Sequence, residues 1–268
     1  MISVVILTRN EAHDLPGCLD SVAWSDDVHV FDSHSEDDTI RIAHTCGAHV
    51  TQRRFDNFAA QRNAALHGER FKYPWVLILD ADERIPEPLH QEMMRFVQSA
   101  GGDVAACRIR RRDYLFGTWL KHAQLSPWYI RLVRPDRVRY EREVNEVLVA
   151  DGPIIDLHES FDHYPFSKGM RHWLDKHNVY STMEAQQVLK GRQGQIAYSP
   201  VKAFFERDFN KRRFHQKELF YRLPARPLLK FFIIYVLRCG ALDGRAGFRS
   251  EEHTSELQSH SDLVCRLL

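Results

Sequence analysis

Short apolar runs alternate with helix-like segments through the first eighty residues, and this alternation restricts the possible folds more than any other feature. The apolar runs span residues 2–7, 28–31, 48–51 and 75–79, and the helical patterns between them span residues 15–22, 39–46 and 57–67. Strands and helices that alternate at this spacing are typical of βαβ units around a parallel sheet. The sequence therefore predicts an α/β fold that begins with a Rossmann-like nucleotide-binding half.

Composition and local motifs argue against several classes of protein. The 268 residues include 37 basic and 36 acidic side chains, so the overall charge gives no reason to expect nucleic acid as a partner. The five cysteines lack C-x-x-C spacing, which argues against a disulfide framework or a zinc site. The glycine fingerprint of dinucleotide-binding proteins and the Walker A loop are both absent from the sequence, so neither NAD nor P-loop chemistry is indicated.

The sequence also favours a cytoplasmic protein. Its first residues lack the charged segment of a signal peptide and reach polar residues after a short apolar run. No apolar run reaches the roughly 18 residues that a membrane-spanning helix requires. Scattered cysteines fit a reducing compartment.

Polar clusters follow three of the predicted strands at the point where each strand ends. They are TRNE at residues 8–11, DSHSED at residues 32–37 and DADE at residues 80–83. Adjacent parallel strands bring such clusters to one rim, where open α/β sheets bind their ligands. Asp80 and Asp82 form the only D-x-D of the chain, and two such carboxylates can converge on one hard divalent cation. A chain of this length contains about one D-x-D by chance, so the prediction of a nucleotide pocket rests on all three clusters.

A fourth polar cluster lies on the predicted helix at residues 57–67. It reads Gln61-Arg62-Asn63, and this part of the helix could face the same rim. Arg62 would suit a phosphate group there, because a guanidinium fork matches phosphate geometry. A solvated helix face explains the cluster equally well.

The rest of the chain predicts further strands and then a basic, aromatic extension. Helices are expected at residues 86–97 and 173–189, and strands at residues 104–112, 129–134 and 144–149. Residues 200–238 are basic and aromatic, and they include an apolar run at residues 227–237 that is too short to span a bilayer. That run suits a membrane surface, and an ordinary buried helix with basic solvent faces is equally compatible.

Residues 249–268 differ abruptly from the segment before them. The string RSEEHTSELQSHSDLVCRLL resembles the in-frame translation of two constant blocks of a sequencing-library adapter, separated by a gap of the size of a sample index. We therefore expect the natural sequence to stop near Phe248. No function is inferred from residues 249–268.

The four polar clusters together resemble those of a known family. A strand followed by TRNE, a strand followed by D-S-x-S-x-D, the helical Q-R-N-x-A and a strand followed by DADE are similar to family 2 glycosyltransferases with the GT-A fold. The subgroup they resemble is the lipopolysaccharide core β-1,4-glucosyltransferases, and the resemblance extends over about residues 1–248. It implies a GT-A domain with a mixed sheet at residues 1–165 and a helical, basic extension at residues 166–248, which would lie at a membrane surface or bind the acceptor.

The resemblance also implies roles for residues at the rim. Asp32 would bind the nucleotide base, and Thr8, Asn10 and Glu11 would line the same pocket. Asp80 would lie near the ribose and the metal, and Asp82 would coordinate Mg²⁺ or Mn²⁺ bridging the diphosphate. A divalent cation there would stabilise the charge that develops on the departing nucleoside diphosphate.

An inverting transfer needs a base for the acceptor hydroxyl, and Glu146 is the candidate that the resemblance implies. Similar proteins carry V-H-E where this chain has Val144-Asn145-Glu146, so Asn145 departs from their pattern. An imidazole at that position could orient the carboxylate. The alternatives are a surface carboxylate without a catalytic role, and the competing bases Glu143, Glu141 and Asp156.

Further residues have open roles. His163 and Tyr164 match an H-Y pair of the similar proteins and are interpreted as acceptor-side or structural. Arg131 and Arg134 flank a predicted strand and could bind a phosphorylated acceptor. Solvent-exposed arginines at a sheet edge, without a binding role, are an equally good interpretation.

The leading hypothesis is an inverting, metal-dependent transfer of a hexose from a nucleotide sugar to a saccharide or lipid-linked acceptor. UDP-glucose is the favoured donor, and the lipopolysaccharide core or another cell-envelope saccharide is the favoured acceptor. The expected location is the cytoplasm, with the inner face of the cytoplasmic membrane as a peripheral site. One alternative is a truncated nucleotide-sugar-binding protein without turnover. Another is a D-x-D phosphohydrolase, whose usual Gly and Thr or Val after the first Asp are lacking here.

Overall fold

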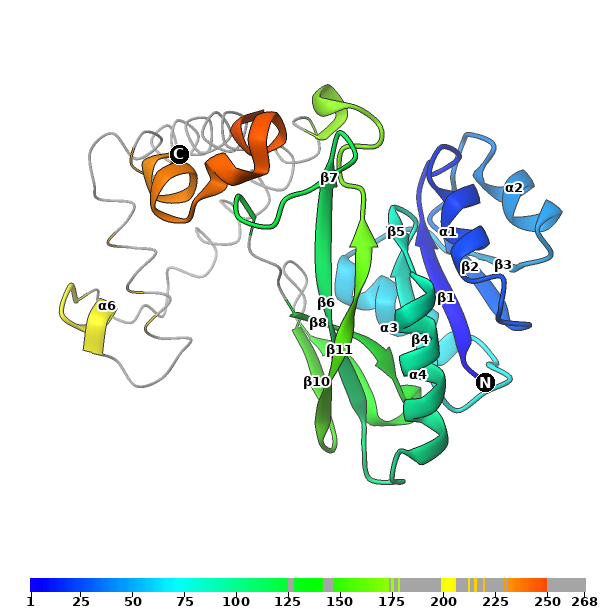
Figure 1. The fold of residues 1–268 in the computed structure, drawn as a ribbon. Helices are drawn as coiled ribbons and strands as arrows, with labels where there is room; N and C mark the ends of the chain where they lie inside the picture. The colour runs from blue at the N-terminus through cyan, green and yellow to red at the C-terminus, as the bar shows by residue number, and fades with distance from the viewer. Residues whose placement is uncertain are drawn as a thin grey trace. The chain divides into compact units, whose positions relative to one another are not determined.

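The computed structural model describes residues 1–124, 128–141, 147–173, 199–205 and 231–249, with the isolated positions 175, 178, 212, 215, 219 and 229. The chain divides into two units. One contains residues 1–121 and 125–169, and the other contains residues 122–124 and 170–268. Figure 1 shows the fold of each unit.

The first unit alternates strands and helices and then continues mainly in strands. Its amino-terminal elements are β1 (Ser3–Thr8), α1 (Leu15–Ser21), β2 (Val28–Asp32), α2 (Thr39–Thr45), β3 (His49–Gln52), α3 (Phe58–Gly68) and β4 (Val76–Asp80). They are followed by β5 (Glu83–Arg84), α4 (Glu87–Ser99), β6 (Ala106–Leu115), β7 (Thr118–Trp119), β8 (Trp128–Val133), the 3-10 helix η1 (Pro135–Arg137), β9 (Val138–Glu141), β10 (Val147–Ala150) and β11 (Ile154–His163).

The described strands form one large mixed sheet and one hairpin. The order in the large sheet is β3-β2-β1-β4-β8-β6-β11-β5, with β7 paired to β6, and β9 pairs with β10. Strands β3, β2, β1 and β4 are parallel, and β8 is antiparallel to both of its neighbours. Thr8 pairs with Asp32 and Leu7 pairs with Asp80, so these strands end at one level. This register brings the first three polar clusters to the same rim.

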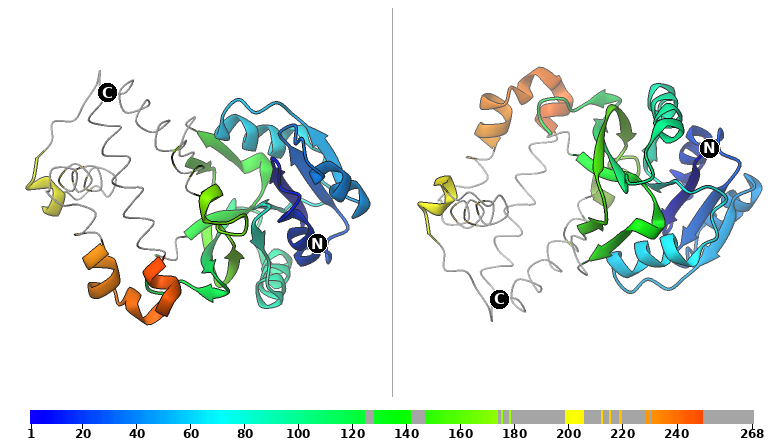
Figure 2. Two further views of the ribbon diagram at one scale, coloured as in Figure 1. Left: turned by 90° about the horizontal axis from the view of Figure 1, so that it is seen from above. Right: turned by 90° about the horizontal axis from the view of Figure 1, so that it is seen from below.

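Both faces of the parallel half are covered, because side chains alternate along its strands. Val4 and Ile6 of β1 belong to a core with residues of α1, α2 and α4, whereas Val5 belongs to a second core with residues of α3. Helices α3 and α4 accordingly lie on opposite faces of the sheet (Figure 2). Strands that are buried on both faces explain why the sequence shows continuous apolar runs there instead of alternation.

The expected fold class is confirmed: the chain is α/β, with a Rossmann-like half and a mixed sheet. The predicted helices and strands up to residue 134 match described elements to within a few residues. Strands β5, β7, β9 and β11 were not anticipated. In β11, for example, Leu157 and Phe161 are buried among exposed polar residues, so apolar positions are too sparse for a clear strand pattern.

The second unit contributes short helical elements to the described residues. They include α6 (Lys202–Phe205), the π-helix η3 (Phe232–Leu237) and the 3-10 helix η4 (Gly240–Asp243). Within it, the Asp243 carboxylate accepts hydrogen bonds from the backbone N–H groups of His122 and Ala123, at 2.8 and 2.7 Å. Most of the helix expected at residues 173–189 and most of the basic region at 200–230 lie outside the described residues, as do residues 250–268 of the expected adapter-derived tail.

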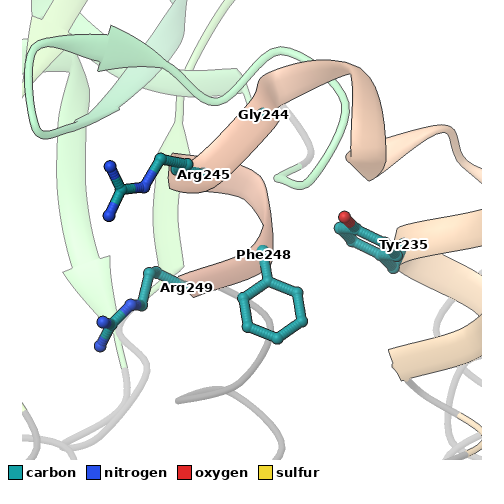
Figure 3. A pocket seen from close by; sticks show the side chains of 5 residues that line it. All are labelled: Tyr235, Gly244, Arg245, Phe248 and Arg249. Carbon is teal, nitrogen blue, oxygen red and sulfur yellow. The ribbon is translucent and has the colours of Figure 1, made fainter.

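A small pocket lies in the second unit. Tyr235, Gly244, Arg245, Phe248 and Arg249 line it, and the Tyr235 and Phe248 rings approach each other with centroids 5.8 Å apart (Figure 3). None of the residues that the sequence assigned to a nucleotide pocket belongs to this lining. Within the described part of the chain, no helix is both long enough and apolar enough to cross a membrane.

The apolar core of the sheet can be tested with a matched pair of isoleucines. Ile78 of β4 is 1% exposed, whereas Ile155 of β11 is 39% exposed. We expect Ile78→Ala to lower the free energy of unfolding by about 3 kcal/mol, because the truncation leaves a cavity, and Ile155→Ala to lower it by less than about 1 kcal/mol. Urea unfolding of both variants measures the difference, and equal losses would contradict this assignment of the core.

Candidate functional site

Asp32 organises the rim at the ends of β1 and β2. Its side chain is fully buried, and Thr8 Oγ1 donates a hydrogen bond to Asp32 Oδ1 at 2.8 Å. Ser35 donates from its backbone N–H to Asp32 Oδ2 at 2.8 Å and from Oγ to Oδ1 at 2.5 Å. The Asn10 N–H in turn donates to Ser35 Oγ at 2.7 Å, and Asn10 holds a φ of 55°, a conformation that Asn adopts more readily than most residues. The structure thus brings Thr8, Asn10 and Asp32 together.

Asp80, at the end of β4, lies between two arginines. Arg62 Nη2 from α3 lies 3.1 Å from Asp80 Oδ1, and Arg131 Nη2 from β8 lies 2.9 Å from Asp80 Oδ2. Arg131 also donates to the buried carboxylate of Glu83, whose Oε2 accepts the Asp80 N–H at 3.0 Å. Burial raises the pKa of Glu83 to about 7, although the charge of Arg131 opposes this shift. Arg62 and Arg131 therefore hold Asp80 in place, and Arg131 is 5% exposed instead of lying at a solvated edge.

Asp82 lies beside His163, the last residue of β11. Asp82 Oδ2 lies 3.4 Å from His163 Nε2, and His163 Nδ1 lies 2.5 Å from Asp113 Oδ1. Arg111 Nε contacts the same Asp113 oxygen at 2.8 Å. Burial opposes the charging of His163, but the charge of Asp82 and the hydrogen bond with Asp113 outweigh it and raise its pKa to about 9.

Asp82 and His163 could share a divalent cation. Among the described residues, no group of three or more His, Cys, Asp or Glu side chains could hold a metal ion, so those residues offer at most a partial set of ligands. A carboxylate and an imidazole nitrogen 3.4 Å apart fit such a set, with the remaining positions open to diphosphate oxygens and water. Asp113 would fix the ring orientation of His163. The H-Y pair was the only sequence signal for His163; its pairing across from Asp113 in the β6–β11 ladder was not predictable.

Arg84 fixes the turn that carries Asp82. Its Nη1 donates to the Ala81 carbonyl and its Nη2 to the Asp14 carbonyl, each at 2.8 Å. The Arg84 guanidinium also lies over the ring of Tyr164, 5.6 Å from its centroid. Space for this side chain depends on Gly17, since a Cβ atom there would lie 2.6 Å from Arg84 Nε. The Tyr164 N–H donates to the Asp82 carbonyl at 2.9 Å, so Tyr164 contacts both Arg84 and the turn that Arg84 fixes.

Glu11 lies at the same rim and is tied to the segment after β11. Lys168 Nζ lies 2.7 Å from Glu11 Oε2 and donates to the Asn10 carbonyl at 2.8 Å. Burial raises the pKa of Glu11 to about 7, while Lys168 partly counteracts the shift. Lys168 had no part in the sequence-based prediction.

Other predicted residues lie elsewhere or cannot be located. Arg134 lies over the Trp75 ring at 4.7 Å, which places it toward the amino end of β4, and Asp156 pairs with Arg108 at 2.7 Å. Glu141 pairs with Arg139 at 2.8 Å. The candidate bases Glu146 and Glu143, together with Asn145, lie outside the described residues, so their roles stay predictions.

Comparison with known sequences identifies the family. Residues 3–153 match the glycosyl transferase family 2 profile, which is more than half of the 268 residues. The chain belongs to glycosyl transferase family 2. The expectation of a GT-A fold agrees with this family and with the mixed sheet described above.

Similar proteins include one glycosyltransferase of lipopolysaccharide core biosynthesis. The chain is 28% identical over 200 residues to the lipopolysaccharide core biosynthesis glycosyltransferase LpsC of Rhizobium meliloti, which covers 71% of this chain and 73% of LpsC. It is 36% identical over 93 residues to the uncharacterized glycosyltransferase RP128 of Rickettsia prowazekii, where the match spans 34% of this chain and only 31% of the relative.

A solved structure with partial likeness is glucosyl-3-phosphoglycerate synthase from Mycobacterium tuberculosis in complex with Mn²⁺, UDP and glucosyl-3-phosphoglycerate. It is 23% identical, with a TM-score of 0.36, and the overlap covers 42% of this chain and 44% of that chain.

The partly buried carboxyl of Glu11 should make stability fall as the pH rises. Its folded-state pKa of about 7 lies above the ordinary value of 4.5. Between these values the folded chain binds more protons than the unfolded chain, so the free energy of unfolding decreases with increasing pH. Glu11→Gln removes the titrating group, and we expect it to abolish up to ~3 kcal/mol of the decline between about pH 5 and about pH 8.

Urea unfolding of wild type and variant at both pH values measures this effect, with Glu36→Gln at an exposed position as the matched control. An E11Q protein whose stability changes with pH as the wild type does would contradict the assignment.

Proposed function

We propose that this family 2 glycosyltransferase moves a hexose from a nucleotide sugar, with UDP-glucose as the favoured donor, to a saccharide of the cell envelope such as the lipopolysaccharide core. The single observation that carries the proposal is the rim itself. Asp32 and Asp80 end strands that the β1 register aligns, Asp82 lies in the turn directly after Asp80, and each of the three is held by specific partners. The similarity to LpsC supports the class of acceptor.

In this proposal the rim binds and orients the donor. Asp32 and the Thr8–Asn10 turn would receive the base, and Arg62, besides holding Asp80, has a guanidinium suited to a phosphate oxygen. Asp82 and His163 would hold Mg²⁺ or Mn²⁺, which when bound stabilises the negative charge of the departing nucleoside diphosphate. We call Asp82 and His163 the metal corner. Asp80, held by two arginines, would position this metal corner and lie near the ribose.

The transfer step would invert the anomeric centre. The acceptor oxygen forms a bond to the anomeric carbon while the bond from that carbon to the diphosphate oxygen breaks, and the hydroxyl proton passes to a carboxylate. Glu146 remains our candidate for this base. It follows β9 in the chain, and β9 packs against α3, the helix that carries Arg62.

We also propose a peripheral position at a membrane surface. Support comes from η3, where Phe232, Val236 and Leu237 are 50%, 51% and 65% exposed. Apolar side chains exposed on a short helical segment are suited to the interface of a bilayer.

Donor activation is tested with Asp82→Ala. We expect hydrolysis of UDP-glucose in the presence of Mn²⁺ to fall by at least roughly 100-fold, because the charge on the departing UDP loses its stabilisation. Calorimetry should show a parallel loss of Mn²⁺ binding in the presence of UDP. Asp136→Ala, at an exposed position of η1, is the control and should behave as the wild type.

An Asp82→Ala protein with wild-type hydrolysis and Mn²⁺ affinity would refute the metal assignment. If the wild type neither binds nor cleaves any nucleotide sugar, the transferase function itself fails. Release of phosphate from simple monoesters, abolished by D82A, would instead favour the phosphohydrolase alternative.

The catalytic base is tested by replacing each candidate carboxylate with the amide of the same shape. Glu146→Gln should lower transfer to a deacylated core oligosaccharide by about 100-fold or more and leave the Kd for UDP-glucose unchanged, since the base acts on the acceptor proton. Glu143→Gln, Glu141→Gln and Asp156→Asn serve as comparisons. A larger loss in one of these three variants would move the role to that residue.

A further inference from the structure

Strand β6 presents a row of arginines on one face of the sheet. Arg108, Arg110 and Arg112 alternate along the strand, and their register partners on β11 are Asp156, Ser160 and Asp162. Arg108 donates two hydrogen bonds to Asp156, at 2.7 and 2.9 Å, and Arg112 Nε lies 2.6 Å from Asp162. The middle arginine therefore faces a serine where both of its neighbours face a carboxylate.

Arg110 is exposed. It forms no ion pair with the described residues, and its guanidinium lies over the ring of Trp128, its register partner on β8, with the guanidinium carbon 4.7 Å from the ring centroid. The Arg108 guanidinium carbon lies 5.9 Å from the same ring. An indole fixes the plane of a guanidinium above it and leaves the N–H edge free for an anion, and it also offers an apolar surface to a sugar ring.

This row lies on the face of the sheet that carries the β9–β10 hairpin. Ala106 of β6 packs in one cluster with Tyr140 of β9 and with Leu148 of β10, and Arg108 and Arg110 follow Ala106 at intervals of two residues. The residues that connect β9 to β10 include Glu146, the candidate base. Asp113, which contacts His163 of the proposed metal corner, belongs to the opposite face of β6.

We propose that Arg110 and Trp128 form an acceptor subsite for a phosphate or carboxylate group carried by a saccharide. The proposal rests on the transferase function and specifies its acceptor as anionic. Arg110 would bind the anion through its guanidinium fork, and Trp128 would hold the fork in place and contact the neighbouring sugar. It replaces the earlier expectation for Arg131, which is buried between Glu83 and Asp80.

The test compares glucose 6-phosphate with glucose as probes of the full-length chain by calorimetry. The wild type should bind glucose 6-phosphate at least roughly ten-fold more tightly than glucose, and Arg110→Gln should remove most of this preference, because a charge-assisted bidentate contact is lost. Arg70→Gln makes the same change of charge at an exposed position between α3 and β4 and should bind as the wild type does. Added salt should weaken the wild-type preference.

Several results would overturn the subsite. They are equal affinity of the wild type for the two probes, equal loss in R70Q and R110Q, or loss of phosphatidylglycerol vesicle binding in R110Q with glucose 6-phosphate affinity intact. The last result would assign Arg110 to a membrane instead.

Failure of the transferase function is distinguishable from failure of the subsite. If the wild type binds no nucleotide sugar but binds glucose 6-phosphate in an Arg110-dependent way, the transferase function is contradicted. Arg110 then belongs to an anion site that is not an acceptor subsite. UDP-glucose binding without Arg110-dependent binding of glucose 6-phosphate contradicts the subsite alone.

Discussion

The buried ion pair between Arg131 and Glu83 is the constraint on which the rim of the sheet depends. The two side chains are 5% and 1% exposed, and a buried charge without a partner costs several kcal/mol, so neither residue can be lost alone. Arg131 lies at a β-bulge of β8: Cys107 pairs with Leu132 and the next residue, Arg108, pairs with Ile130, which leaves Arg131 as the extra residue. Bulges re-aim side chains in this way, and here the arginine reaches the turn after β4.

This bulge gives the two aspartates of the D-x-D different surroundings. Asp80 receives Arg62 and Arg131, whereas Asp82 faces His163. Two guanidinium groups satisfy a carboxylate and compete with a cation for its oxygens, while an imidazole can release its proton and become a ligand beside Asp82. The pattern D-x-D treats both positions alike. The different contacts of Asp80 and Asp82, on which their proposed roles rest, arise only from the residues that the fold brings alongside them.

The parallel half was predictable because local sequence determines it. Apolar runs, helix patterns and turn residues each act over a few positions, and three strand-end clusters must then meet once the strands are parallel. The partners of those clusters were not predictable. Arg131 depends on a bulge, His163 on the register of β6 with β11, and Lys168 on the path of the chain after β11. Each contact joins residues more than 40 positions apart through a pairing that leaves no periodic signal.

The register of strand β6 bears on both of the proposed sites. Ile109, which packs in the core beneath α4, and Asp113, which contacts His163, belong to one face of the strand. Arg110 and Arg112 belong to the opposite face. A slip of one residue would exchange the two faces, placing arginines against the apolar core and removing Asp113 from His163. The ion pairs of Arg108 and Arg112 with β11 resist such a slip, because it would separate both arginines from their carboxylates. The same contacts that fix the register therefore leave Arg110 as the one arginine of this row without an ion pair to a described residue.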